Sequence, residues 1–286
     1  MHFRASAILL LIIAFSPAAL AETLTAVSTA SAVAATPTAT PTTIPTTPPA
    51  AITMPACMPY IGEHMSFNIG WEFINAGSSS MDITAINNGW QAKTFARTNK
   101  VLDVFRKVRD HITATGICVN GNMQSTVFDA NLHERKYKAN KRTDFLWQQN
   151  RVSYTQHQVS EYFDVPAGHL SIIDAFLSVR KQQLKAGETV TVSVFDSRKR
   201  YELQVNVLAK KAILTAPWGE KVRCIIVNPK LKTAGIFTNK GKMTLWMTDD
   251  ERHIPIKMMA KIKFGRIFAR LTSYSMTPPA KVSSSQ

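Results

Sequence analysis

The stretch GKMTLWMTDDERHIPIKMMAKIKFGRIFARL, residues 241–271, decides the fold of this chain. From Met243 to Met247 every second residue is apolar, and after the run DDER a second alternation begins at Ile254. A period of two is typical of a strand with one buried face and one exposed face. The stretch therefore predicts a long antiparallel hairpin whose acidic run forms the turn.

The same alternation recurs along most of the chain from about residue 60 onward. Strand-like runs recur at a spacing of roughly ten residues and are separated by turn signals such as Asn87-Asn88-Gly89 and Asn120-Gly121, which is typical of an antiparallel meander. One segment differs, because residues 170–180 place apolar side chains three and four apart, as a helix does. We therefore expect an all-β-dominated fold, a single curved antiparallel sheet with one packed helix.

The N-terminus has the features of an export signal. Arg4 precedes an apolar run, and the small-residue sequence Ala19-Leu20-Ala21 follows, so we expect a signal peptide at 1–21. That run is too short to span a bilayer about 30 Å thick, which predicts no transmembrane segment in the mature chain. Residues 22–54 are Ala-, Thr- and Pro-rich and predict a disordered linker. We expect the folded domain at 55–275, a disordered tail at 276–286, and a periplasmic or secreted location.

The chain is strongly basic, with a formal net charge of +15 and an isoelectric point near 9.9. This charge is consistent with solubility alone, or with an anionic partner such as a phospholipid head group, lipopolysaccharide or an acidic glycan. The export signal argues against nucleic acid. The most basic segment is 132–151, where Tyr137, Phe145 and Trp147 interleave with Lys and Arg.

Three cysteines are present, so at least one thiol stays unpaired within the chain. Cys224 lies in the strand-like run VRCIIV, where a buried free thiol is the commoner case. Cys57 and Cys118 are the better-placed pair for a disulfide in an oxidising compartment.

Trp246 is the most informative residue of the hairpin predicted for residues 241–271. A four-residue turn would place it opposite Pro255, on the face that carries Lys257 and Lys261. It then belongs either to a second small core covered by the helix or to an exposed platform for a sugar ring or an anionic amphiphile. Trp246, Lys257, Lys261 and Trp71 are accordingly the candidate ligand-binding residues.

Several other residues are expected to have structural roles. Arg180 lies six positions after Asp174 on the helix, so the two residues are on different faces and do not pair. A buried Arg180 would need an acidic partner elsewhere, for which Glu63 and Asp250 are the candidates. At Gly265 the apolar residues change from even to odd positions, which predicts a β-bulge that bends the sheet.

Three segments resemble an exported bacterial family, domain of unknown function 3108. They are YIGEHMSFNIGWEFINAGSSSMDI (60–83), IIDAFLSVR (172–180) and LWMTDDERHIPIKMMAKIKFGRIFARL (245–271). The last is the most specific, since its Trp, acidic pair, Pro and Gly fall at the family's offsets. The resemblance implies a secreted or periplasmic β-rich fold, a half-barrel or spiral around one helix, and implies no mechanism.

Recognisable catalytic motifs are absent from the sequence. It contains neither the nucleophile elbow G-x-S-x-G nor the zinc motif H-E-x-x-H. Asp249, Asp250 and His253 form the one close acidic and histidine cluster, and such a run more often serves its own turn. We therefore predict no catalytic residue, metal site or cofactor.

The leading functional hypothesis is a non-enzymatic envelope protein that binds a lipid-like or anionic glycan ligand or maintains envelope integrity. An envelope hydrolase using an Asp/His set and an interaction module for envelope machinery are the alternatives. An apolar cavity of several hundred cubic ångströms would favour the first, converging acids and histidines the second, and a filled sheet the third.

Overall fold

The computed structural model describes residues 57–135, 137–233, 236–237, 242–262 and 265–277. These residues form one antiparallel sheet of sixteen strands, which confirms the predicted fold class. In the main hydrogen-bonded order, β8 to β1 follow one another backwards and continue through β16, β15, β14, β12, β10 and β9, while β11 and β13 pair with β12. The strands are β1 (Glu63–Trp71), β2 (Ile74–Ile86), β3 (Gly89–Thr98), β4 (Arg109–Val119), β5 (Asn122–Glu134), β6 (Tyr137–Leu146), β7 (Arg151–Gln156), β8 (Val159–Asp164), β9 (Thr189–Asp196), β10 (Lys199–Val207), β11 (Ala212–Thr215), β12 (Lys221–Thr233), β13 (Ile236–Phe237), β14 (Lys242–Thr248), β15 (Pro255–Ile262) and β16 (Gly265–Met276).

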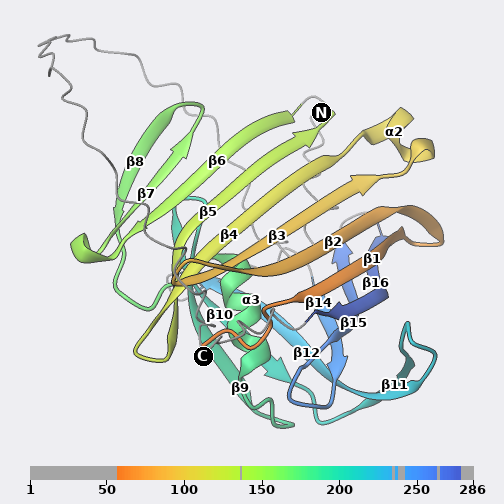
Figure 1. Ribbon diagram of the computed structural model, residues 1–286. Coiled ribbons are helices and arrows are strands. Elements are labelled where there is room, and N and C mark those ends of the chain that lie inside the picture. The colour runs from red at the N-terminus through yellow and green to blue at the C-terminus, as the bar shows by residue number, and fades with distance from the viewer. Residues whose placement is uncertain (1–56, 136, 234–235, 238–241, 263–264, 278–286) are drawn as a thin grey trace, which may run out of the picture.

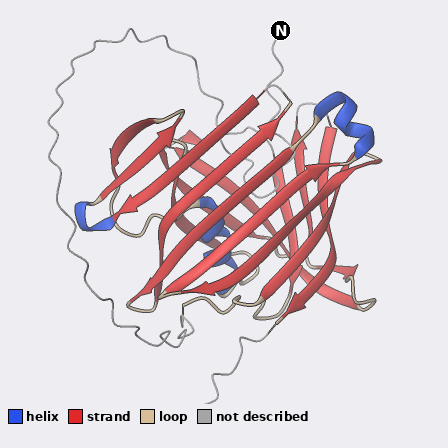
Figure 2. Ribbon diagram, turned by 45° about the horizontal axis from the view of Figure 1, so that its top comes forward, coloured by secondary structure: helices blue, strands red, loops and turns tan. Residues whose placement is uncertain are grey.

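The sheet curves around a helix. Figures 1 and 2 show α3 (Ile172–Lys181) enclosed by the two halves of the sheet, as the predicted single packed helix would be. A second helix, α2 (Lys100–Arg106), and the 3-10 helix η1 (Trp147–Gln149) were not predicted. Since α2 has only seven residues, it is too short to reveal a helical period, and its start is fixed by the Asn99 side chain, which accepts a hydrogen bond from the backbone of Leu102.

The two ends of the strand order are β8 and β9, and no ladder joins them within the described residues. Side chains bridge this gap instead. Arg198, in the β9–β10 turn, lies 2.7 Å from Glu161 of β8 and stacks 4.8 Å from the ring centre of Tyr154. The rings of Phe163 and Phe195 meet beside them at 5.5 Å. The sheet is thus an incomplete barrel.

The inner face of the sheet and one side of α3 make the core. On β15, for example, Ile256, Met258 and Ala260 are buried, whereas Lys257 and Lys261 lie on the outer face. From α3, the side chains of Ile173, Ala175 and Leu177 are fully buried. Removing this apolar surface from water stabilises the curved sheet.

The hairpin formed by β14 and β15 has a different register from the one predicted from the sequence. Trp246 pairs with Lys257, and Met247 pairs with Pro255, so Trp246 is not opposite Pro255. An irregularity between Trp246 and Met247 leaves Ile256 as an extra residue on β15. Pro255 has no N–H to donate to the ladder, which explains why regular pairing ends there.

The predicted bulge at Gly265 is wrong, because the chain reverses at this point. β15 ends at Ile262, β16 begins at Gly265, and these two residues pair with each other. A reversal moves the apolar residues from even to odd positions just as a bulge would. Gly265 has φ of +102°, and a Cβ atom there would lie 2.6 Å from Oε1 of Glu72, so both conformation and space favour glycine.

A disulfide joins Cys57 to Cys118, the pair that the sequence favoured, while Cys224 is free and buried. The expected signal peptide, the linker and most of the C-terminal tail lie outside the described residues and stay predictions. Within the part of the chain described, no helix has the length and apolar content needed to cross a membrane.

Candidate functional site

Arg180 anchors the C-terminal end of α3. Its guanidinium is fully buried and donates two parallel hydrogen bonds to Glu63, at 2.6 and 2.7 Å. It also donates to the backbone oxygens of His253 and Arg252, and it stacks 4.1 Å from the ring centre of Tyr60. Of the two candidate partners, the structure thus selects Glu63. Because every one of these contacts is internal, Arg180 serves to fasten the helix to β1 and to the β14–β15 turn.

Asp174 anchors the other end of α3, near its start. Its carboxylate is fully buried and accepts hydrogen bonds from the Trp90 indole at 3.0 Å, from Ser125 at 2.5 Å and from Ser171 at 2.8 Å. The Trp90 ring crosses Gly116, where a Cβ atom would lie only 2.2 Å from the ring. Asp174 therefore fastens the helix to β3 and β5 and does not pair with Arg180.

The acidic side chains of the β14–β15 turn, Asp249 and Asp250, are bonded to other groups of the protein. Asp249 lies 2.6 Å from Lys211 and 2.7 Å from Arg223, and these partners, Lys211 first, hold the pKa of Asp249 below its usual value. Asp250 accepts hydrogen bonds from the Thr248 hydroxyl and from the backbone of the turn. No metal-binding group of three or more His, Cys, Asp or Glu occurs among the described residues. The contacts of these two aspartates thus stabilise the turn itself.

The four predicted ligand-binding residues do not form one site. Lys257 lies on the outer face with its ammonium 4.8 Å from the ring centre of Trp246 and 5.3 Å from that of Phe268. Lys261 is two residues farther along the same strand. Trp71, by contrast, pairs with the buried Ile267 and so belongs to the inner-face positions of β1.

Trp246 packs, partly buried, against the edge of the hydrophobic core, while its neighbours along β14 are the residues that lie with the helix. Phe176 of α3 lies with Leu245 and Met247, the neighbours of Trp246 whose side chains point inward. They line a small apolar cavity of about 50 Å³ beneath the helix, too small for a lipid tail. Trp246 is half-buried on the outer face, against Lys257.

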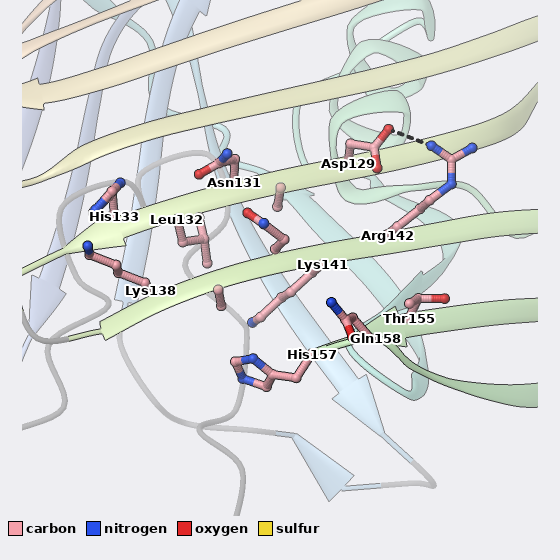
Figure 3. Close-up of a pocket in the computed structure, with 13 residues that line it drawn as sticks. Asp129, Asn131, Leu132, His133, Lys138, Lys141, Arg142, Thr155, His157 and Gln158 are labelled. Carbon is pink, nitrogen blue, oxygen red and sulfur yellow. Dashed lines mark hydrogen bonds and ion pairs between the residues drawn. The ribbon is translucent and has the colours of Figure 1, made fainter.

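A larger hollow, of about 890 Å³, lies against β5, β6, β7 and the β7–β8 turn (Figure 3). Its lining includes residues on either side of the β5–β6 turn, and Figure 1 shows this turn at the same end of the sheet as α2. The residues that line it are Asp129, Ala130, Asn131, Leu132, His133, Lys138, Ala139, Asn140, Lys141, Arg142, Thr155, His157 and Gln158.

Strand alternation separates these residues into two faces. Leu132 pairs with Ala139, and Ala130 pairs with Lys141, and these positions share the inner face with the core. Figure 3 shows the Lys141 side chain extending toward His157 of the turn. No carboxylate pairs with Lys141 within the described residues. The inner lining therefore combines a small apolar surface with one cation.

On the outer face of the lining, Arg142 is already paired with carboxylates. The Arg142 guanidinium lies 2.7 Å from Asp144 and 3.1 Å from Asp129, so two carboxylates engage it. Partial burial raises the pKa of Asp129, against the opposing effect of Arg142. In the ladder between β5 and β6, Lys138 lies opposite His133, on this same outer face. Lys141 is thus the lysine of the lining that lies on the inner face.

Sequence reasoning identified the basic segment 132–151 but assigned no site to it. The alternation of Lys138, Ala139, Asn140 and Lys141 was visible in the sequence. Which of the two faces is the inner one follows only from the pairing of β5 with β6 and of β6 with β7.

The architecture defines an incomplete β-barrel wrapped around one anchored helix, with a hollow against β5, β6 and β7. The chain belongs to the DUF3108 family, described as "Protein of unknown function (DUF3108)", whose pattern matches residues 66–272. The resemblance seen in the sequence is confirmed. Among curated proteins, none matches this chain in sequence.

The solved structures that match this chain include the following two. A "Beta-barrel-like Protein of Domain of Unknown Function DUF1849" from Brucella abortus has a TM-score of 0.53 at 8% identity, with 77% of this chain and 99% of that one covered. A "putative lipoprotein" from Parabacteroides distasonis has a TM-score of 0.29 at 9% identity, with 75% and 95% covered. The first supports the barrel-like fold alone.

Proposed function

We propose that this protein is a non-enzymatic, extracytoplasmic binding protein for an amphiphile with an anionic head group. The observation that carries the proposal is the hollow of about 890 Å³, where Lys141 stands beside Ala130, Leu132 and Ala139. An apolar chain would lie against these three residues, and its head group would accept hydrogen bonds from Lys141. A purely polar glycan would leave the apolar lining unused.

The location outside the cytoplasm is supported by two features. The disulfide between Cys57 and Cys118 is typical of an oxidising compartment. The N-terminal sequence has the order of a signal peptide.

Oleate binding, measured by the displacement of a bound fluorescent fatty acid, tests this function. Lys141→Glu should weaken oleate binding about tenfold or more, because a charge-assisted hydrogen bond becomes a repulsion. Lys230→Glu is the matched control, since it makes the same charge change at an exposed outer-face residue of β12 that does not line the hollow, and should leave affinity within about twofold. Circular dichroism of both variants verifies that they fold.

Two results would contradict the proposal. One is equal weakening by both variants, which would indicate a general charge effect. The other is tight binding of dextran sulfate, sensitive to Lys141→Glu, with no binding of oleate, which would identify a glycan site instead. Lipids found by native mass spectrometry of protein isolated from its own cells should carry an anionic head group.

A further inference from the structure

Exposed apolar side chains gather at the α2 end of the sheet. Phe73, in the β1–β2 turn, is 96% exposed, and Ile74 beside it is 50% exposed. On α2, Val101 and Val104 are 69% and 80% exposed. Hydrogen bonds from Asn99 to the backbone of β2 hold the start of α2 beside this hairpin. We call Phe73, Ile74, Val101 and Val104 the apolar rim.

Single exposed apolar residues are ordinary on a protein surface, but four of them on two neighbouring elements are not. The positive φ of Glu72, 49°, belongs to the tight turn that carries Phe73 at its tip. Figure 1 shows both the turn and α2 at the outer margin of the sheet. The apolar side chains are thus presented on projecting tips.

The charges around the apolar rim are predominantly positive. Arg97, Lys100 and Lys107 are exposed next to it. The two nearby carboxylates are held by arginines, Glu72 by Arg266 at 3.1 Å and Asp103 by Arg109 at 2.6 Å. The hydrogen bond with Arg109 is the main cause of the lowered pKa of Asp103. The rim therefore offers apolar tips within a surplus of cations.

We propose that the apolar rim inserts into the surface of a membrane that contains anionic lipids. Apolar tips enter the boundary between head groups and acyl chains, and neighbouring lysines and arginines contact the lipid phosphates. A protein partner would be better served by a continuous apolar face than by separate tips. The surplus of positive charge selects a negatively charged surface.

The apolar rim and the hollow are neighbours, connected through the β5–β6 turn. The backbone N–H of Arg135, in the β5–β6 turn, donates to the carbonyl of Lys107 at the end of α2, at 2.8 Å. The hollow extends along β5 and β6 from the same turn. A membrane docked at the rim would therefore lie beside the hollow. Membrane docking itself does not require that the hollow bind a ligand.

Vesicle co-sedimentation tests the inference on the protein as its own cells produce it. The double variant Phe73→Asp/Val104→Asp should reduce binding to vesicles of phosphatidylcholine with phosphatidylglycerol by about tenfold or more. Ile213→Asp/Trp218→Asp is the matched control, since it adds the same two charges at residues 71% and 40% exposed on β11 and the turn after it, at the opposite end of the sheet, and should leave binding unchanged. Raising NaCl from about 0.1 M to about 0.5 M should weaken binding of the unmodified protein.

Three outcomes would overturn the inference. They are equal binding to pure phosphatidylcholine vesicles, an equal loss in the double variant and the control, and a dimer in sedimentation velocity that the double variant abolishes. The test is separate from that of the hollow, because Lys141→Glu should retain vesicle binding while losing oleate.

Discussion

Two buried side chains of opposite sign hold α3, and they are stabilised in different ways. Arg180 faces a full opposite charge on Glu63, in a bidentate pair. Asp174 accepts hydrogen bonds from neutral donors on Trp90, Ser125 and Ser171. Burial raises the pKa of Asp174 above its usual value, against the opposing effect of these hydrogen bonds. The stability of the fold should therefore depend on pH through Asp174.

The sign of this dependence follows from the folded state's preference for the protonated acid. Below the unfolded pKa, about 3.9, Asp174 is protonated in both states and its favourable contribution is complete. As pH rises through the higher folded pKa, ionising the buried acid removes that contribution. Between about pH 4 and pH 7 the unmodified protein should lose more free energy of unfolding than Asp174→Asn, by about 1.4 kcal/mol for each unit of the pKa difference.

Urea denaturation at several pH values measures this difference. Asp164→Asn is the control, because the Asp164 side chain is 95% exposed, and it should follow the unmodified protein. Parallel pH profiles for the unmodified protein and Asp174→Asn would contradict the prediction. An overall offset between the two profiles would not, since the amide also changes the hydrogen bonds.

At the scale of elements, the disulfide ties the segment before β1 to the end of β4 across 61 residues of sequence. Closing a loop of this length restricts the unfolded chain and contributes about 4 kcal/mol to the free energy of unfolding. The variant Cys57→Ala/Cys118→Ala should lose about that amount, and a thiol reductant should lower the stability of the unmodified protein similarly.

Guanidinium denaturation with and without reductant checks this prediction. Cys224→Ala is the control, because Cys224 is buried and free, so its variant should keep the full effect of the reductant. A reductant effect of equal size in the unmodified protein and in the double variant would show that the disulfide is not its cause.

The strands and α3 could be predicted because their signals are local. Alternating residues in β14 and β15 and the three- and four-residue spacing in α3 each lie within one element. Pairing is a non-local property, which is why the register at Pro255 was wrong. At Gly265 a bulge and a reversal give the same change from even to odd positions, and the pairing of Ile262 with Gly265 identifies the reversal.

The candidate site was less predictable than the fold. The sequence drew attention to Trp246, whose chemistry is conspicuous, and not to Lys141, which is one of many lysines. The significance of Lys141 depends on its neighbours Ala130 and Leu132, which reach it only through the pairing of β5 with β6. The partner of Arg180 could be narrowed to two acids, since a buried guanidinium requires one.

At the scale of the whole molecule, the feature that separates this protein from a closed barrel is the gap between β8 and β9. Arg198 and Glu161 span it, and both side chains are more than a third exposed. Such a pair contributes about 1 kcal/mol or less. The edge strand β8 should therefore open locally more readily than the strands that have ladders on both sides.

Reversing one charge at the gap should make this local opening more frequent. In Arg198→Glu, two carboxylates would face each other, so amide hydrogen exchange in β8 should accelerate by up to about fivefold, the equivalent of about 1 kcal/mol. Exchange in β1, which has β2 and β16 on its two sides, should stay unchanged. The double variant Arg198→Glu/Glu161→Arg restores opposite charges and should return β8 to its original rate. If the double variant exchanged as fast as Arg198→Glu, the stacking of Arg198 on Tyr154, and not the ion pair, would be what holds the edge of the sheet.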